Sequence, residues 1–264
     1  MQLAFARQAD RIWILNVGDI KPLEIPISHF LDMAYDTPKW SYDSVPDWLN
    51  QWATLSFDAN HAAGIVSALE RYGMYAARRK YELMDPSFYS VINYNEADAV
   101  LAQWQQLAED AQSIYDVLSG EYQAAFYEMI LQPVLGGQTI YQIYINAAKN
   151  QQYVEQKRTS ANDKAMEVLQ AFKKDAKLTQ RYHELLDGKW NHMLDRKLST
   201  GRLETCTDQN RNPSGISRIL AATNAQHSSS DSLGPGSRNL SCWKSWCRSR
   251  RKQCHRLWGR CLSR

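Results

Sequence analysis

This 264-residue sequence lacks long apolar runs, and its first 195 residues lack cysteine. No stretch approaches the roughly 20 apolar residues of a membrane-spanning helix, which excludes an integral membrane protein of that type. Residues 1–10 contain no long apolar segment, so we expect no signal peptide. Glycine-rich phosphate loops, a serine nucleophile elbow and an H-E-x-x-H zinc helix are also missing. The absence of cysteine excludes thiol catalysis in residues 1–195.

Charge is distributed unevenly about residue 195. Residues 196–264 hold 14 Lys and Arg against 3 Asp and Glu, a net charge of +11, whereas residues 1–195 hold 17 against 25, a net charge of −8. The basic segment has no Tyr, Phe or Val, so we expect it to be disordered, because it cannot bury enough apolar surface to offset its ordering entropy. The composition changes abruptly at Arg196, inside an expected helix, as an out-of-frame translation would also produce.

Two further interpretations of residues 196–264 are open. Four cysteines and one histidine are candidate zinc ligands: Cys242, Cys247, Cys254, His255 and Cys261. Their spacing fits none of the common paired zinc-ligand patterns, which favours unpaired thiols at the cysteines. The basic run 248–252, with three tryptophans nearby, could attract polyanions without specificity. The alternative function is therefore a non-catalytic helical interaction module with a polyanion-binding tail.

Apolar residues at a helical period dominate residues 44–195, and short loops between them predict an antiparallel helical bundle. We expect Asn93 and Glu96 to form a capping box, and Pro133 to break or kink a helix that follows Gly120. A preceding helix is expected to end only at Asp85–Pro86. The clearest helical stripe comprises Ala97, Val100, Leu101, Trp104, Leu107, Ala108, Ala111, Ile114, Tyr115 and Leu118.

Residues 11–17 are rich in β-formers and predict a buried parallel strand, followed by a turn and a helix. Because one strand cannot make a sheet, either the partner strands are missing or the segment is not a strand. Asn16 and Asp19 would lie at the strand's C-terminal end, where an α/β barrel places its active site, with Lys21 in the loop. Alternatively, Asn16 and Asp19 only cap a turn.

An aromatic loop follows this unit. Trp40 and Tyr42 are candidates for stacking on sugar rings, and they could equally well fill the seam between two domains.

Five segments carry a family resemblance: RIWILNVGDIKPLE at 11–24, FLDMA at 30–34, RRKYEL at 78–83, YNEA at 94–97 and GKWNHM at 188–193. They resemble glycoside hydrolase family 115, the xylan α-1,2-glucuronidases, over residues 1 to about 195. The resemblance implies a mainly α fold, in which residues 1–43 are the last helix–strand unit of a truncated (β/α)8 catalytic barrel and residues 44–195 are the bundle. Residues 196–264 would be the basic, low-order tail.

The resemblance also implies a reaction. The family hydrolyses the α-1,2 bond that joins glucuronic acid, or its 4-O-methyl ether, to xylan, with inversion. Asn16 matches a catalytic position, and Asp19, Lys21, Trp40 and Tyr42 would bind substrate. The general acid would lie outside this chain, which we therefore expect to be inactive alone.

The expected partner is glucuronoxylan or a derived oligosaccharide, with no metal or organic cofactor, no specific nucleic acid and no membrane. The intact enzyme is expected to be extracellular, and the resemblance allows a homodimer.

Overall fold

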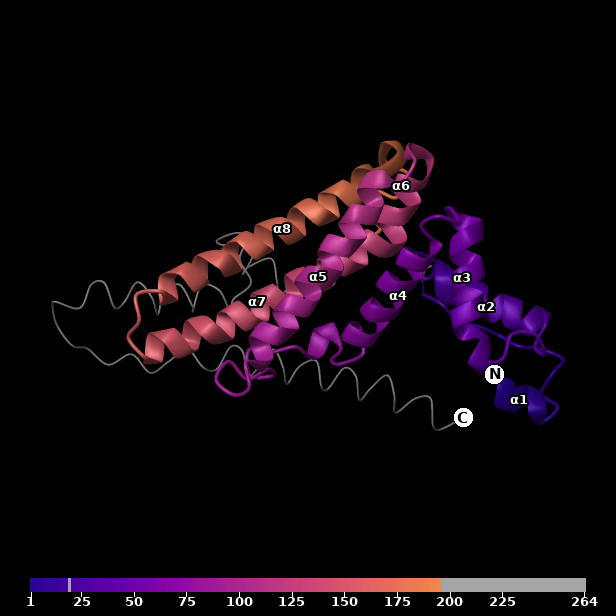
Figure 1. The fold of residues 1–264 in the computed structure, drawn as a ribbon, viewed down its shortest axis with the longest axis horizontal. Helices are drawn as coiled ribbons and strands as arrows, with labels where there is room; N and C mark the ends of the chain where they lie inside the picture. The colour runs from indigo at the N-terminus through magenta and orange to yellow at the C-terminus, as the bar shows by residue number, and fades with distance from the viewer. Residues whose placement is uncertain (19, 196–264) are drawn as a thin grey trace, which may run out of the picture. The chain divides into compact units, whose positions relative to one another are not determined.

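The computed structural model of the chain describes residues 1–18 and 20–195, and the regular structure within them is helical (Figure 1). This confirms the mainly α fold predicted from the sequence. The tail prediction lies outside the described residues. No helix in the described part is long and apolar enough to span a membrane. The helices are α1 (Gln2–Ala6), α2 (Glu24–Tyr35), α3 (Val45–Ser56), α4 (Ala62–Ala76), α5 (Glu96–Val117), α6 (Gly120–Phe126), α7 (Gln132–Glu155) and α8 (Ala161–Gly188).

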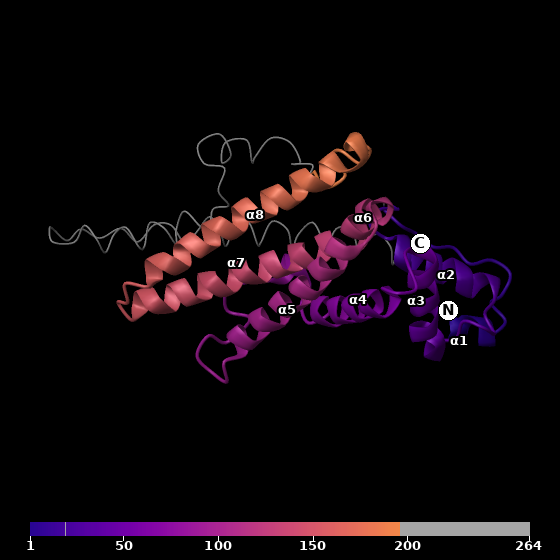
Figure 2. The same ribbon diagram turned by 45° about the horizontal axis from the view of Figure 1, so that its top comes forward.

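Three long helical segments make the antiparallel bundle. They are α5, the continuous run from α6 to α7, and α8. Helix α7 packs against both α5 and α8, and α4 packs against α5. Figures 1 and 2 show α7 and α8 side by side as a hairpin. The stripe predicted on α5 faces the core, with six of its members buried along the helix: Ala97, Val100, Trp104, Leu107, Ala108 and Ala111. Periodic apolar spacing thus predicted this helix correctly.

A π-helical turn, η3 (Tyr127–Leu131), joins α6 to α7. The sequence predicted that Pro133 would break or kink the helix, but the chain stays helical through it. Proline lacks an N–H, and its ring crowds a carbonyl one turn earlier. The wider π turn immediately before Pro133 accommodates this defect without ending the helix.

The predicted strand at residues 11–17 is not formed. The structure has no β-strand among its described residues, and residues 12–17 adopt no regular structure. A strand requires a hydrogen-bonded partner, and none of the described segments supplies one. The side chains of Ile12 and Ile14 are consequently 79% and 77% exposed.

Two local predictions in the bundle were wrong. The capping box is absent, because the Glu96 carboxylate instead accepts a hydrogen bond from the Ser90 backbone N–H at 2.8 Å. Helix α4 ends at Ala76 rather than near residue 85. The chain then forms a short 3-10 turn, η2 (Tyr81–Leu83), which lets Met84 enter the core. Packing of Met84 in the core is therefore favoured over extension of α4 to residue 85.

Gly137 in α7 allows α5 to approach closely. The Trp104 indole from α5 is fully buried and lies against the Gly137 backbone. A Cβ at Gly137 would lie 2.5 Å from Cη2 of Trp104 and 2.8 Å from the hydroxyl of Tyr81. Both neighbours are rigid aromatic groups in the core, so they have little room to move.

We predict that Gly137→Ala destabilises the protein. The expected loss is about 1–3 kcal/mol from overpacking, reduced by the roughly 1 kcal/mol that alanine adds in helix propensity. Gly136→Ala is the matched control, because a Cβ there would meet only Gln132 Nε2 at 3.7 Å, an ordinary contact. Chemical denaturation should show Gly136→Ala at or above wild-type stability and Gly137→Ala below it. Equal stability of the two variants would contradict this account.

Candidate functional site

The predicted site residues fall into an exposed group and a buried group. The Asn16 side chain is exposed in the irregular segment before Gly18. Asp19 lies outside the described residues, and Tyr42 is described only through its backbone, which begins the 3-10 turn η1 (Tyr42–Ser44). The Trp13 ring, within the same segment, packs edge-on to the Phe5 ring, and its centroid lies 6.1 Å from that of the Phe30 ring. These two contacts anchor the segment to α1 and α2.

Trp40 belongs to the core. It is 8% exposed and forms a cluster with Trp48 and Leu49 of α3, against Ile25 and Met33 of α2. Its ring leaves little free surface on which a sugar could stack. Burial at this position favours the domain-seam interpretation of the aromatic loop.

Lys21 brings together parts of the chain that are distant in sequence. Its ammonium contacts the Glu24 carboxylate, donates to Glu128 Oε2 at 3.3 Å and lies 4.2 Å from the centroid of the Trp190 ring. The other carboxylate oxygen of Glu128 accepts a hydrogen bond from the Tyr182 hydroxyl at 3.3 Å. The Tyr182 and Trp190 rings lie 6.4 Å apart. We call these five residues the Lys21 cluster.

The electrostatics of the Lys21 cluster follow from its burial. Burial alone lowers the pKa of Lys21, but its bonds to Glu24 and Glu128 outweigh this effect and the net pKa is raised. Glu128 is 1% exposed, and burial raises the pKa of its carboxyl. Glu24 raises it further, and Lys21 and Tyr182 oppose the rise without cancelling it.

The chemistry available to this cluster is limited. A general acid or base must reach the substrate, whereas Glu128 is enclosed and both of its oxygens are bonded to protein groups. Glu24 is half-buried and shares the same ammonium. The cluster therefore holds the chain together rather than forming a hydrolytic pair of carboxylates.

Sequence reasoning did not select Glu24, Glu128, Tyr182 or Trp190 as site residues. One signal was present: Glu128 is the single charged residue in the otherwise apolar and aromatic run from 124 to 131. A lone carboxylate on a core-facing stretch needs a buried partner. No local feature of the sequence identified that partner as Lys21.

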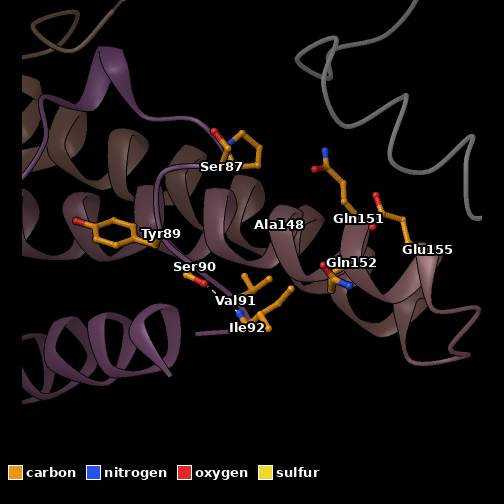
Figure 3. Close-up of a pocket in the computed structure, with 10 residues that line it drawn as sticks. Ser87, Tyr89, Ser90, Val91, Ile92, Ala148, Gln151, Gln152 and Glu155 are labelled. Carbon is orange, nitrogen blue, oxygen red and sulfur yellow. Dashed lines mark hydrogen bonds between the residues drawn. The ribbon is translucent and has the colours of Figure 1, made fainter. Parts of the chain in front are cut away.

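Two surface hollows offer alternative sites. One, of about 250 Å³, lies between the loop before α5 and the C-terminal part of α7 (Figure 3). The other, of about 280 Å³, lies between α7 and α8. Each is lined by one carboxylate, Glu155 or Glu167, so neither offers an acid–base pair. Within residues 1–18 and 20–195, no group of three His, Asp or Glu side chains could hold a metal ion.

The raised pKa of Glu128 predicts a specific pH dependence of stability. The folded protein holds the Glu128 proton more tightly than the unfolded chain, so the contribution of Glu128 to the free energy of unfolding is greatest below the ordinary glutamate pKa of about 4.3. This contribution is lost as the pH rises through the raised pKa that Glu128 has in the folded protein. Relative to wild type, Glu128→Gln should therefore gain stability with rising pH in this window. Denaturation curves at several pH values measure the difference, with the exposed Glu121→Gln as control, and parallel curves for wild type and Glu128→Gln would refute the prediction.

Comparisons with known proteins relate the chain to one family of glycoside hydrolases. Residues 1–83 match the family model described as glycosyl hydrolase family 115. A solved structure that aligns with the chain is a family 115 4-O-methyl-α-glucuronidase with specificity for decorated arabinogalactans, with a TM-score of 0.59 and 26% sequence identity. The alignment covers 74% of this chain and 27% of that enzyme, and a search of the curated proteins found no match. Residues 1–83 thus match glycoside hydrolase family 115, and the fold of the chain resembles part of a solved member of that family.

Proposed function

We propose that this chain contributes the last strand unit of a catalytic barrel and a helical domain to an inverting glycoside hydrolase. The enzyme releases α-1,2-linked glucuronic acid, or its 4-O-methyl ether, from a polysaccharide. The observation that carries the proposal is the family match over residues 1–83, since these residues include the segment around Asn16. The aligned solved structure is itself a 4-O-methyl-α-glucuronidase, which supports the same reaction class.

The exposed apolar segment supports the barrel assignment. Ile12, Ile14 and Ile20 are among the most exposed large apolar side chains of the described chain, and Leu15 and Val17 are also exposed. A run of β-formers uncovered in this way is typical of a strand whose neighbours belong to a larger sheet. We therefore expect residues 11–17 to pair with barrel strands outside the described residues.

The reaction assigns Asn16 a limited role. Inverting hydrolysis needs one carboxylic acid to protonate the leaving oxygen and one carboxylate to activate water, about 6.5–9.5 Å apart. Glu24 and Glu128 already bond to Lys21, so we assign neither of them as the acid or the base, which the family resemblance places outside this chain. An amide such as Asn16 cannot serve as a base, but it can orient the water or hold a sugar hydroxyl, because it donates and accepts hydrogen bonds.

Two polysaccharides fit the proposed reaction. The sequence resemblance favours glucuronoxylan or its oligosaccharides. The enzyme of the aligned structure is specific for decorated arabinogalactans, which makes an arabinogalactan side chain the second candidate. Parallel assays of the longer family enzyme that contains this segment, on both polysaccharides and with the released acid identified by chromatography, decide between them.

We predict that the 264-residue chain alone releases no glucuronic acid or 4-O-methylglucuronic acid from either polysaccharide. Among the described residues no strand pairs with residues 11–17, and the two carboxylates of the Lys21 cluster, Glu24 and Glu128, both bond to Lys21. A purified sample is compared with a heat-inactivated one over a long incubation. Turnover above the inactivated control would show that the chain is catalytically complete.

In the longer family enzyme that contains this segment, Asn16→Ala should lower kcat by about 10²–10³ if the amide acts mainly in the transition state. The melting temperature should stay near wild type, because the side chain is exposed. If Asn16 instead caps a turn, the variant loses roughly 0.5–2 kcal/mol of stability and keeps its kcat. Asn93→Ala, the same change at another exposed loop position, is the control, and a folded Asn16→Ala enzyme with normal kcat rules out the catalytic assignment.

A further inference from the structure

Lys21 ties the segment that carries Asn16 to the helical bundle. It follows Asn16 by five positions, and its ammonium reaches Glu128, which lies 107 positions further along the chain. It also lies over the ring of Trp190, just beyond the end of α8. One side chain next to the candidate loop therefore contacts both the π turn before α7 and the end of α8.

The two carboxylates on Lys21 act over different ranges. Glu24 is three residues away in the same local turn, so its bond to Lys21 holds the ammonium without connecting it to the bundle. Glu128 belongs to the buried π turn, and its second oxygen bonds to Tyr182 of α8. Of the two, Glu128 provides the link to the bundle.

The π turn explains how a carboxylate comes to lie at this place. Four of its five residues are buried, and Glu128 is the charged one among them: Tyr127, Glu128, Ile130 and Leu131. A buried carboxylate is costly unless its oxygens are bonded. Here Lys21 and Tyr182 each bond to one oxygen, so the carboxylate is fixed in direction as well as in place.

From this geometry we infer that Glu128 is a positioning residue, which acts through Lys21 to fix the segment containing Asn16 against the helical domain. The inference rests on the proposed function, in which Asn16 contacts the glucuronosyl substrate. Lys21, predicted to bind substrate, is thereby a structural link whose ammonium is already bonded to protein. The substrate-facing group of this loop is Asn16, which is exposed.

The first test measures backbone order in the 264-residue chain by ¹⁵N relaxation. In Glu128→Gln and in Lys21→Met, the order parameters of residues 16–18 should fall below about 0.6, while those of α5 and α7 stay near about 0.85. Glu24→Gln is the matched control, because it removes the same charge from the same ammonium but leaves the link to the bundle. The double variant Lys21→Met/Glu128→Gln should show no further loss, since both changes break one interaction.

Unchanged order at residues 16–18 in Glu128→Gln, or an equal loss in Glu24→Gln, would overturn the inference. The second test uses the longer family enzyme, where Glu128→Gln should lower kcat on the order of ten- to a hundredfold with KM changed little, because misplaced reacting groups slow the chemical step. A loosened loop with normal kcat would leave the positioning role intact and instead refute the proposed role of Asn16. The two failures are therefore distinguishable.

Discussion

The arrangement of the bundle depends on the contact between the Trp104 indole and the backbone of Gly137. The ring is fully buried and packs against Tyr72 and Tyr75 of α4 and Tyr141 of α7, so one side chain of α5 fixes the positions of both neighbouring helices. Its Nε1 is buried without a hydrogen-bond partner, which costs about 1–3 kcal/mol. The structure tolerates this cost because no smaller residue would fill the space between α4, α5 and α7.

The parts of the fold that follow from local chemistry were predictable. The buried face of α5 could be derived from spacing alone, because its apolar residues repeat at the helical period from Ala97 to Ala111. The absence of the capping box could not be predicted. The Glu96 carboxylate accepts a hydrogen bond from the Ser90 N–H, and only the folded loop brings that donor near. The π turn was also missed, because a proline within an apolar run predicts a defect in the helix but not its form.

The candidate site shows the same division between local and long-range information. Asn16 was selected from its place after a run of β-formers, and the structure leaves it exposed. Lys21 was selected as the loop residue that follows this run, but its distant partners, Glu128 in the π turn and Trp190 just beyond α8, come from much later in the chain. Trp40 was an aromatic in a loop, and only the packing of α2 on α3 shows that its ring is enclosed. Sequence pattern indicates which residues carry chemistry, whereas burial decides which of them remain free to use it.

The π turn also constrains the length of the chain. Each residue of an α-helix advances its side chain by about 100°, and a π turn is equivalent to one extra residue within an otherwise regular helix. Because the wide turn accommodates that residue, α6 and α7 keep the faces that they would have in one regular helix. Removing a single residue between Gln132 and Gly137, where the helix is regular, would instead rotate the rest of α7 by about 100° relative to Glu128. Glu128 and the Gly137 contact surface could then no longer face Lys21 and Trp104 at the same time. The number of residues between Glu128 and Gly137 is thus fixed by two packing requirements, even though substitutions within the segment can preserve its apolar character.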